Sequence, residues 1–198
     1  MLSLRSIVGF LLRLALFYGL LAAPWPKLRE GYAAIFRTCG STLFTIFERG
    51  TSVRFEPNPG NARTADTRIV MKTPWSHQPH AAELSSRMAG YLPAAQLAAL
   101  VLAAPLRWAR KWRALLWGLL WVNCFVAVRV WCIVFVVYSN TNPPRFNVGQ
   151  LAADVVSVIA SPTPAFLVAP LVFLAVALRR RDVEKIFGAG APRSPSGH

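Results

Sequence analysis

The chain has 198 residues, of which 55% are hydrophobic and 15% are charged, and its mean hydropathy is +0.41. A soluble domain typically has roughly 25% charged residues and does not gather its apolar residues into long blocks. The composition argues against an ordinary soluble domain and predicts an all-α polytopic membrane protein.

The net charge is +14, from 22 Lys and Arg against 8 Asp and Glu. In a soluble protein this excess would suggest nucleic acid as a partner, but no nucleic-acid-binding motif is present. The densest basic runs instead adjoin apolar segments, where positive residues mark the cytoplasmic side of a membrane and contact anionic lipid headgroups. These topology-determining residues are Arg107, Arg110, Lys111, Arg113, Arg179, Arg180 and Arg181.

Residues 1–26 are predicted to form an N-terminal membrane anchor, with an apolar stretch over Ile7–Ala23. A cleaved signal peptide is the alternative, because Arg5 precedes the apolar stretch and small residues end it. Pro24 would be a poor first residue of a mature chain, so the uncleaved anchor is favoured. Arg13 lies about 9 Å into this segment at 1.5 Å per residue, and we expect it to reach the cytoplasmic headgroups.

Residues 27–87 form the longest polar section and are predicted to be extracytoplasmic. Apolar residues recur at helical spacing over Tyr32–Phe47, which predicts an amphipathic helix. Two alternating stretches, Ser52–Glu56 and Thr67–Lys72, flank the turn-forming residues 57–61 and predict a β-hairpin. An isolated hairpin is marginally stable in water, so we expect it to pack on the helix, the membrane or a partner.

Residues 88–181 are predicted to hold three further transmembrane helices, which makes four in the chain. The first of the three is rich in Ala, which suits close packing between helices. The three segments are Met88–Leu106, Ala114–Tyr138 and Ala165–Leu178.

An interfacial segment, residues 147–160, precedes the last of these helices and carries Asp154. Pro162 follows it, and the sequence leaves open whether residues 148–178 form one kinked helix or two. The remaining residues, 182–198, are rich in Gly, Pro and Ser and predict a disordered cytoplasmic tail.

Four transmembrane helices with basic residues at these positions predict that both termini are cytoplasmic. The section over residues 27–87 also carries many Lys and Arg residues. Long loops are translocated largely regardless of charge, so this section does not contradict the topology.

Arg129 is the most unusual residue of the third apolar segment, which also contains Asn123. An Arg near the middle of a bilayer costs about 2.5–3.5 kcal/mol on insertion scales. Three interpretations stay open: the side chain reaches the outer headgroups, it pairs with Asp154 or Glu83, or it acts on a substrate.

Cys124 and Cys132 in the same segment raise the possibility of a membrane thiol peptidase. Such chemistry needs a base, normally His, and no His lies in a predicted span. His77 and His80 have a spacing of three, which differs from the spacing of four in a helical zinc pair, so a solvated loop is favoured there. No catalytic residue, metal site or cofactor is predicted.

The order of these features matches the layout of one protein family over roughly residues 5–138. The features are the anchor FLLRLALFYGLLAAPW, the amphipathic stretch, a β-like section ending in IVMKTP, Tyr91-Leu92-Pro93 opening an Ala/Leu-rich span, and a basic turn into a Leu- and Trp-rich span. The chain thus resembles exosortase-associated integral membrane proteins of bacteria, in particular the exosortase H-associated type.

The resemblance implies the bacterial inner membrane and an accessory role beside an exosortase, a transpeptidase that processes surface proteins. The exosortase itself carries its Cys before Ser-Gly, whereas Phe125-Val126 follow Cys124 here, so the chain does not resemble the enzyme. The predicted function is a non-enzymatic accessory membrane subunit of an envelope protein-sorting system. The alternatives are a membrane enzyme or small transporter that uses Arg129, and a structural subunit of another large membrane complex.

Overall fold

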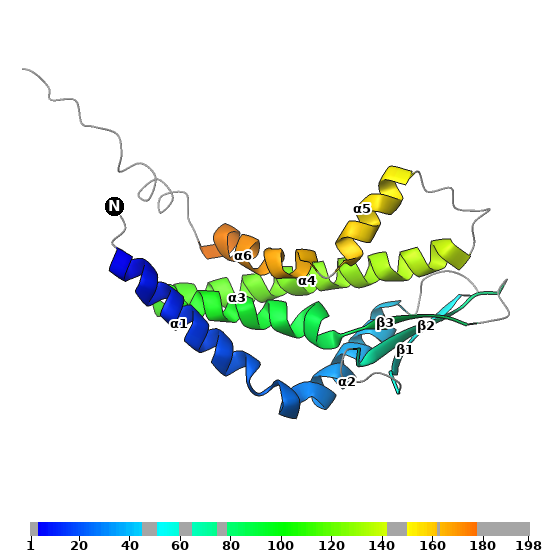
Figure 1. Ribbon diagram of the computed structural model, residues 1–198, viewed down its shortest axis with the longest axis horizontal. Coiled ribbons are helices and arrows are strands. Elements are labelled where there is room, and N and C mark those ends of the chain that lie inside the picture. Colours follow the sequence, from blue (N-terminus) through cyan, green and yellow to red (C-terminus); the bar gives the residue numbers. More distant parts are fainter. Residues whose placement is uncertain are drawn as a thin grey trace, which may run out of the picture.

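The computed structural model describes residues 4–44, 51–59, 65–74, 79–141, 150–161 and 163–177. Helices predominate in these ranges (Figure 1). A small antiparallel sheet follows the second helix in the chain. In chain order the elements are α1 (Leu4–Ala22), α2 (Trp25–Phe44), β1 (Ser52–Pro57), β2 (Thr67–Lys72), β3 (His80–Leu84), the π-helical turn η1 (Arg87–Tyr91), α3 (Leu92–Ala103), α4 (Trp108–Thr141), α5 (Gln150–Ala160) and α6 (Thr163–Ala177).

Helix α4 is the axis of the molecule. Its 34 residues make it about 51 Å long at 1.5 Å per residue. One end of α4 packs against α3 and α6, and α1 lies against α3 (Figure 1). The other end runs past these helices and packs against the sheet and α5 (Figure 1).

A stripe of small and β-branched residues explains how one helix serves both ends. Every fourth residue of α4 is buried over most of its length, while its other faces are largely exposed. Four residues turn a helix by 400°, so such a stripe moves about 40° around the axis at each step. It therefore faces α3 near its start and the sheet near its end. Its members are Ala114, Gly118, Val122, Val126, Val130, Val134 and Tyr138.

The close contact between α3 and α4 depends on Gly118. A Cβ atom at this position would lie 2.7 Å from Cδ2 of Leu97, which is fully buried. Small residues allow helix backbones to approach in this way. The Ala-rich sequence of α3 also predicts close packing between helices, and Ala95, Ala99 and Ala103 are buried.

The sheet has the order β1-β2-β3 and is antiparallel throughout. Its inner face places Phe55 opposite Ile69, and both pack into the core with α4. On its outer face Arg68 lies between two carboxylates, Glu56 on β1 and Glu83 on β3. Opposite charges at directly facing positions stabilise a sheet by about 0.2–1 kcal/mol per pair.

The predicted hairpin is confirmed, but the sheet has a third strand that the sequence analysis placed in a loop. Strand β3 has the sequence HAAEL, which lacks β-branched and aromatic residues. Its strand conformation comes from pairing with β2 and from burial of Leu84, and local propensity does not predict it.

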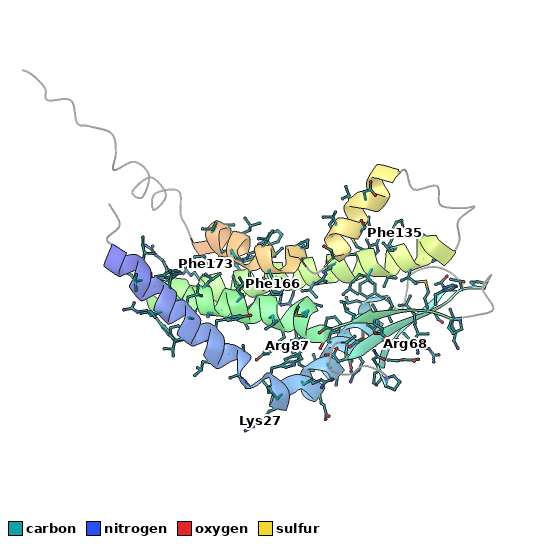
Figure 2. All side chains as sticks on the ribbon, in the orientation of Figure 1. Lys27, Arg68, Arg87, Phe135, Phe166 and Phe173 are labelled. Carbon is teal, nitrogen blue, oxygen red and sulfur yellow. The ribbon has the colours of Figure 1, made fainter. Side chains whose placement is uncertain are left out.

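The predicted amphipathic helix begins earlier than expected, at Trp25. Pro26 lies in its first turn, where a backbone N–H would have no acceptor within the helix, so the lack of this N–H in Pro costs no hydrogen bond. Helices α1 and α2 meet at an angle of 66° (Figure 1). Lys27 projects from the outside of this bend (Figure 2).

The prediction of four transmembrane helices is not supported. Among the described residues only α4 is long and apolar enough to cross a membrane alone, and the bent pair α1 and α2 would make a second span if counted together. The apolar helices over Arg87–Ala103 and Phe166–Val176 are shorter. Only 33% of the most apolar part of α4 is buried, unlike the core helix of a soluble domain.

The question of one helix or two after residue 148 is answered for the described residues. Helices α5 and α6 are separate and point in different directions, since α5 ends at Ala160 and α6 begins at Thr163 (Figure 1). Phe166 and Phe173 lie on α6 along α4 (Figure 2). The predicted tail, residues 182–198, lies outside the described residues.

Candidate functional site

Arg129 is buried at the junction of α4, α5 and α6, with 4% of its side chain exposed. Its Nε and Nη2 atoms both donate hydrogen bonds to the carbonyl oxygen of Ala160, each at 3.3 Å. Ala160 is the last residue of α5, where carbonyl groups lack partners within the helix and a positive charge is favourable. Arg129 therefore holds the end of α5 against α4.

The hydrogen-bonding capacity of Arg129 is not fully used. Its Nη1 atom is buried and has no hydrogen-bond partner. A buried donor without an acceptor costs about 1–3 kcal/mol, and more when it is charged. The junction is thus a strained point of the helical layer as well as a link in it.

Two of the interpretations of Arg129 are wrong. The side chain is buried, so it does not reach outward to headgroups. Its hydrogen bonds go to a backbone carbonyl, and neither Asp154 nor Glu83 pairs with it. Asp154 is exposed on α5, and Glu83 faces Arg68 across the sheet.

The other intramembrane polar candidates do not join Arg129. Asn123 is exposed on α4, and its Nδ2 atom donates to the carbonyl oxygen of Leu119 in its own helix at 2.7 Å. Arg13 is exposed on α1. Cys124 is exposed and Cys132 is buried. Asn123 and Arg13 therefore lie at exposed positions, whereas the Arg129 side chain is buried.

No group of three or more His, Cys, Asp or Glu side chains lies close enough to bind a metal ion within the described residues. His77 lies outside them, and His80 is exposed on β3.

The basic cluster before α4 lies at one end of the helical layer. Arg107, Arg110 and Arg113 are exposed there. Lys111 donates from Nζ to the carbonyl oxygen of Leu102 at 2.8 Å and so caps the last turn of α3. The start of α1 and the end of α6 lie at the same end (Figure 1). Arg179, Arg180 and Arg181 lie outside the described residues.

An aromatic cluster fixes the bend between α1 and α2. The rings of Trp25, Tyr32 and Tyr91 contact one another, with centroid separations of 4.7–5.9 Å. Tyr91 donates from its hydroxyl to the carbonyl oxygen of Leu21 at 2.5 Å. The guanidinium of Arg87 lies 5.8 Å from the Trp25 ring, within the range of a cation–π contact (Figure 2).

Burial raises the pKa of Tyr32 to about 12, and Tyr91 and Asp66 add smaller contributions. The phenol, which is neutral at physiological pH in water as well, is thus held more firmly in its neutral form. A Cβ atom at Gly90 would lie 2.5 Å from its hydroxyl oxygen, so η1 approaches Tyr32 closely only because this residue is Gly.

Asp66, which the sequence analysis did not single out, connects the sheet to η1. Its carboxylate accepts hydrogen bonds from the backbone N–H of Ser86 at 2.9 Å and from the Ser86 hydroxyl at 2.7 Å. A carboxylate at a helix start satisfies a free N–H and favours the helix dipole. The only local signal is the pair Ser85-Ser86 before the helix, which is typical of a cap.

An apolar groove lies between α2 and α4 beneath β1, and we call it the α2–α4 groove. Its inner part has a volume of about 250 Å³, and an adjoining open part has about 310 Å³. The inner part is lined by Phe36, Cys39, Gly40, Leu43, Phe44, Phe55, Asn123, Val126, Ala127 and Val130. The open part is lined by Leu43, Phe44, Ala127, Val128 and Trp131.

The outer face of α4 is a second unpartnered surface. Trp117 and Trp121 are both 59% exposed, and Leu116 and Leu120 lie beside them with more than half of each side chain exposed. Residues three and four apart share one helix face, so these four side chains form one patch, which we call the α4 tryptophan patch.

No protein-family model, curated protein or solved structure matches this chain.

Proposed function

We propose that the protein is a non-enzymatic accessory subunit that docks on another membrane protein through the α4 tryptophan patch. The observation that carries this proposal is the position of Trp117 and Trp121. At 1.5 Å per residue they lie about 14 and 20 Å from Trp108 along α4, in the middle of a hydrocarbon layer of about 30 Å. Trp in membrane proteins prefers the two interfaces, so lipid tails do not account for these residues. Protein interfaces are enriched in Trp.

The orientation follows from the basic cluster in this proposal. The end of the helical layer with Arg107, Arg110 and Arg113 faces the cytoplasm and its anionic headgroups, and both termini lie on that side. The sheet and α2 lie on the outer side of a bacterial inner membrane.

The polar residues of α4 favour an accessory role over an enzyme or transporter. The hydrogen bonds of Arg129 hold α5, and the amide of Asn123 bonds to its own helix. A transporter or enzyme that uses Arg129 needs this side chain to face a water-filled cavity, and neither part of the α2–α4 groove is lined by it.

The identity of the partner rests on the sequence resemblance. An exosortase-type transpeptidase works on chains anchored in the same membrane, and a subunit with an outer sheet and a docking helix is suited to stand beside it. Envelope protein sorting is therefore the proposed process.

The test is recovery of the partner in a mild-detergent pulldown from the native cells, with identification by mass spectrometry. Trp117→Ala with Trp121→Ala should reduce the recovered polytopic partner by about 30-fold or more, because truncating a buried interface Trp costs about 2 kcal/mol or more. Leu167→Ala with Leu171→Ala is the matched control, since both residues are more than 60% exposed on α6.

Equal recovery by the Trp variant and the wild type would contradict docking through the patch. Recovery of the wild type as a monomer without protein partners would contradict the accessory role. A partner that is not an exosortase but is lost in the Trp variant would support the alternative of another membrane complex.

A further inference from the structure

The two parts of the α2–α4 groove adjoin each other. Its inner and open parts share three lining residues, Leu43, Phe44 and Ala127. Phe55 closes the inner end, since its ring lies 2.9 Å from the place where a Cβ would stand on Gly40. The opposite end opens at Trp131 on the exposed side of α4.

The lining of the groove selects an apolar occupant. Polar side-chain atoms come from Cys39 and Asn123 in the inner part and from the indole N–H of Trp131 in the open part, and the rest of the wall is apolar. The amide N–H of Asn123 already donates to Leu119 in α4. A peptide backbone or a polar ligand placed here would leave its own polar groups without partners, which costs several kcal/mol in an apolar site.

The groove is large enough for a hydrocarbon chain but too small for a helix. A helix with its side chains is about 10 Å across, far wider than a space of 250–310 Å³ permits for even one turn. A hydrocarbon group has a volume near that of a water molecule, about 30 Å³, so the inner part holds roughly eight methylene groups.

The depth of the groove matches the outer leaflet in the proposed orientation. Its α4 residues run from Asn123 to Trp131, about 23 to 35 Å from Trp108, so the groove extends from the outer leaflet of a hydrocarbon layer about 30 Å thick into the outer headgroup region. The open end thus lies at the headgroup level, where an acyl chain of an outer-leaflet lipid enters it.

We propose that the α2–α4 groove binds one acyl chain of a membrane lipid. The site goes beyond docking on a partner protein, since the α4 tryptophan patch does not line the groove. The lipid holds α2, and with it the sheet, against α4 on the outer side of the membrane.

The test is photocrosslinking in vesicles of phosphatidylethanolamine and phosphatidylglycerol that contain a trace of phosphatidylglycerol with a diazirine on one acyl chain. Crosslinks mapped by mass spectrometry should concentrate on the groove-lining residues of α2 and α4. Ala127→Trp fills the groove and should reduce these crosslinks by about tenfold or more, because lost contact with two methylene groups alone has that effect. Ala109→Trp places the same side chain at an exposed position at the start of α4 and should change nothing.

A second measurement needs no substitution in the groove. Both thiols are exposed, but Cys39 lines the groove whereas Cys124 lies outside it on α4. Added lipid should slow alkylation of Cys39 in the delipidated wild type more than alkylation of Cys124, because the surrounding bilayer alone covers Cys124. Trp117→Ala with Trp121→Ala should retain both effects, which separates this site from the docking surface.

Three results would overturn the proposal. They are crosslinks spread evenly over the exposed faces of the helices, unchanged crosslinking in Ala127→Trp, and equal lipid effects on the two thiols. Crosslinking of a copurified protein segment into the groove would overturn it as well.

Discussion

At the scale of single residues, Arg129 combines a structural task with an energetic cost. It satisfies a carbonyl at the end of α5 but keeps a charged group with one unpaired nitrogen in the interior. Removing one partner of a buried polar contact is more damaging than the strength of the contact suggests, because the remaining partner stays desolvated.

Arg129→Ala should therefore lower the free energy of unfolding by about 1–3 kcal/mol, since it leaves the Ala160 carbonyl without its donor and opens a cavity. Arg129→Lys should cost less, because an ammonium group can still donate to that carbonyl. Thermal unfolding in detergent, followed by circular dichroism, measures the difference.

Arg13→Ala is the control for a lost arginine on an exposed surface, and it should change the stability by no more than about 0.5 kcal/mol. If the Arg13 and Arg129 variants unfold alike, the link between Arg129 and α5 does not contribute to stability.

At the scale of elements, the contact of α3 with α4 is set by one missing side chain. Gly118 lets Leu97 lie directly on the backbone of α4. The two helices are held by packing of small and branched residues and by the hydrogen bond from Lys111 to the carbonyl oxygen of Leu102.

Gly118→Leu should force the helices apart and lower the free energy of unfolding by about 1–3 kcal/mol, as overpacking does. Adding Leu97→Ala should restore part of this loss, because the shortened side chain makes room for the new one. Thermal unfolding of both single variants and of the double variant gives the coupling free energy between positions 97 and 118.

Gly9→Leu is the matched control, since no atom lies within 4 Å of a Cβ at Gly9 on α1. Additive effects of the Gly118 and Leu97 substitutions would contradict the direct contact.

The elements that the sequence predicts well are those with local signals. The pairing of β1 with β2, the apolar length of α4 and the amphipathic character of α2 all follow from residues close together in the chain. The elements that differ from expectation lack such signals. The residues of β3 have low strand propensity, and α6 is apolar but too short to cross a membrane alone.

At the scale of the whole molecule, the protein has two regions along α4. One is a layer of apolar helices with a basic end, and the other is the sheet with α2 and α5 (Figure 1). The large exposed apolar side chains of α1, α4 and α6 make the first region suited to lipid, since such surfaces are rare on soluble monomers.

In the proposed orientation the basic end of the helical layer faces the cytoplasm, and the sheet lies on the outer side of the inner membrane. A Cys introduced at Ser52 on β1 should react with a membrane-impermeant maleimide in spheroplasts, and one at Ala109 should react only after membrane disruption. Both positions are exposed, and a background with Cys39, Cys124 and Cys132 replaced removes other thiols.

The opposite labelling pattern would reverse the orientation. Labelling of both positions in intact spheroplasts would contradict a membrane crossing between them.

The sequence by itself determined the properties that depend on near neighbours: the apolar length of α4, the basic end of the helical layer, the hairpin and the amphipathic α2. The tertiary structure decided the angle between α1 and α2, the pairing of β3 with the sheet, and the carbonyl to which Arg129 donates. The carbonyl that Arg129 binds is 31 positions away, and Ser86 lies 20 positions from Asp66. Contacts over such distances depend on how the packed elements meet, and no periodicity or turn motif in the chain encodes them.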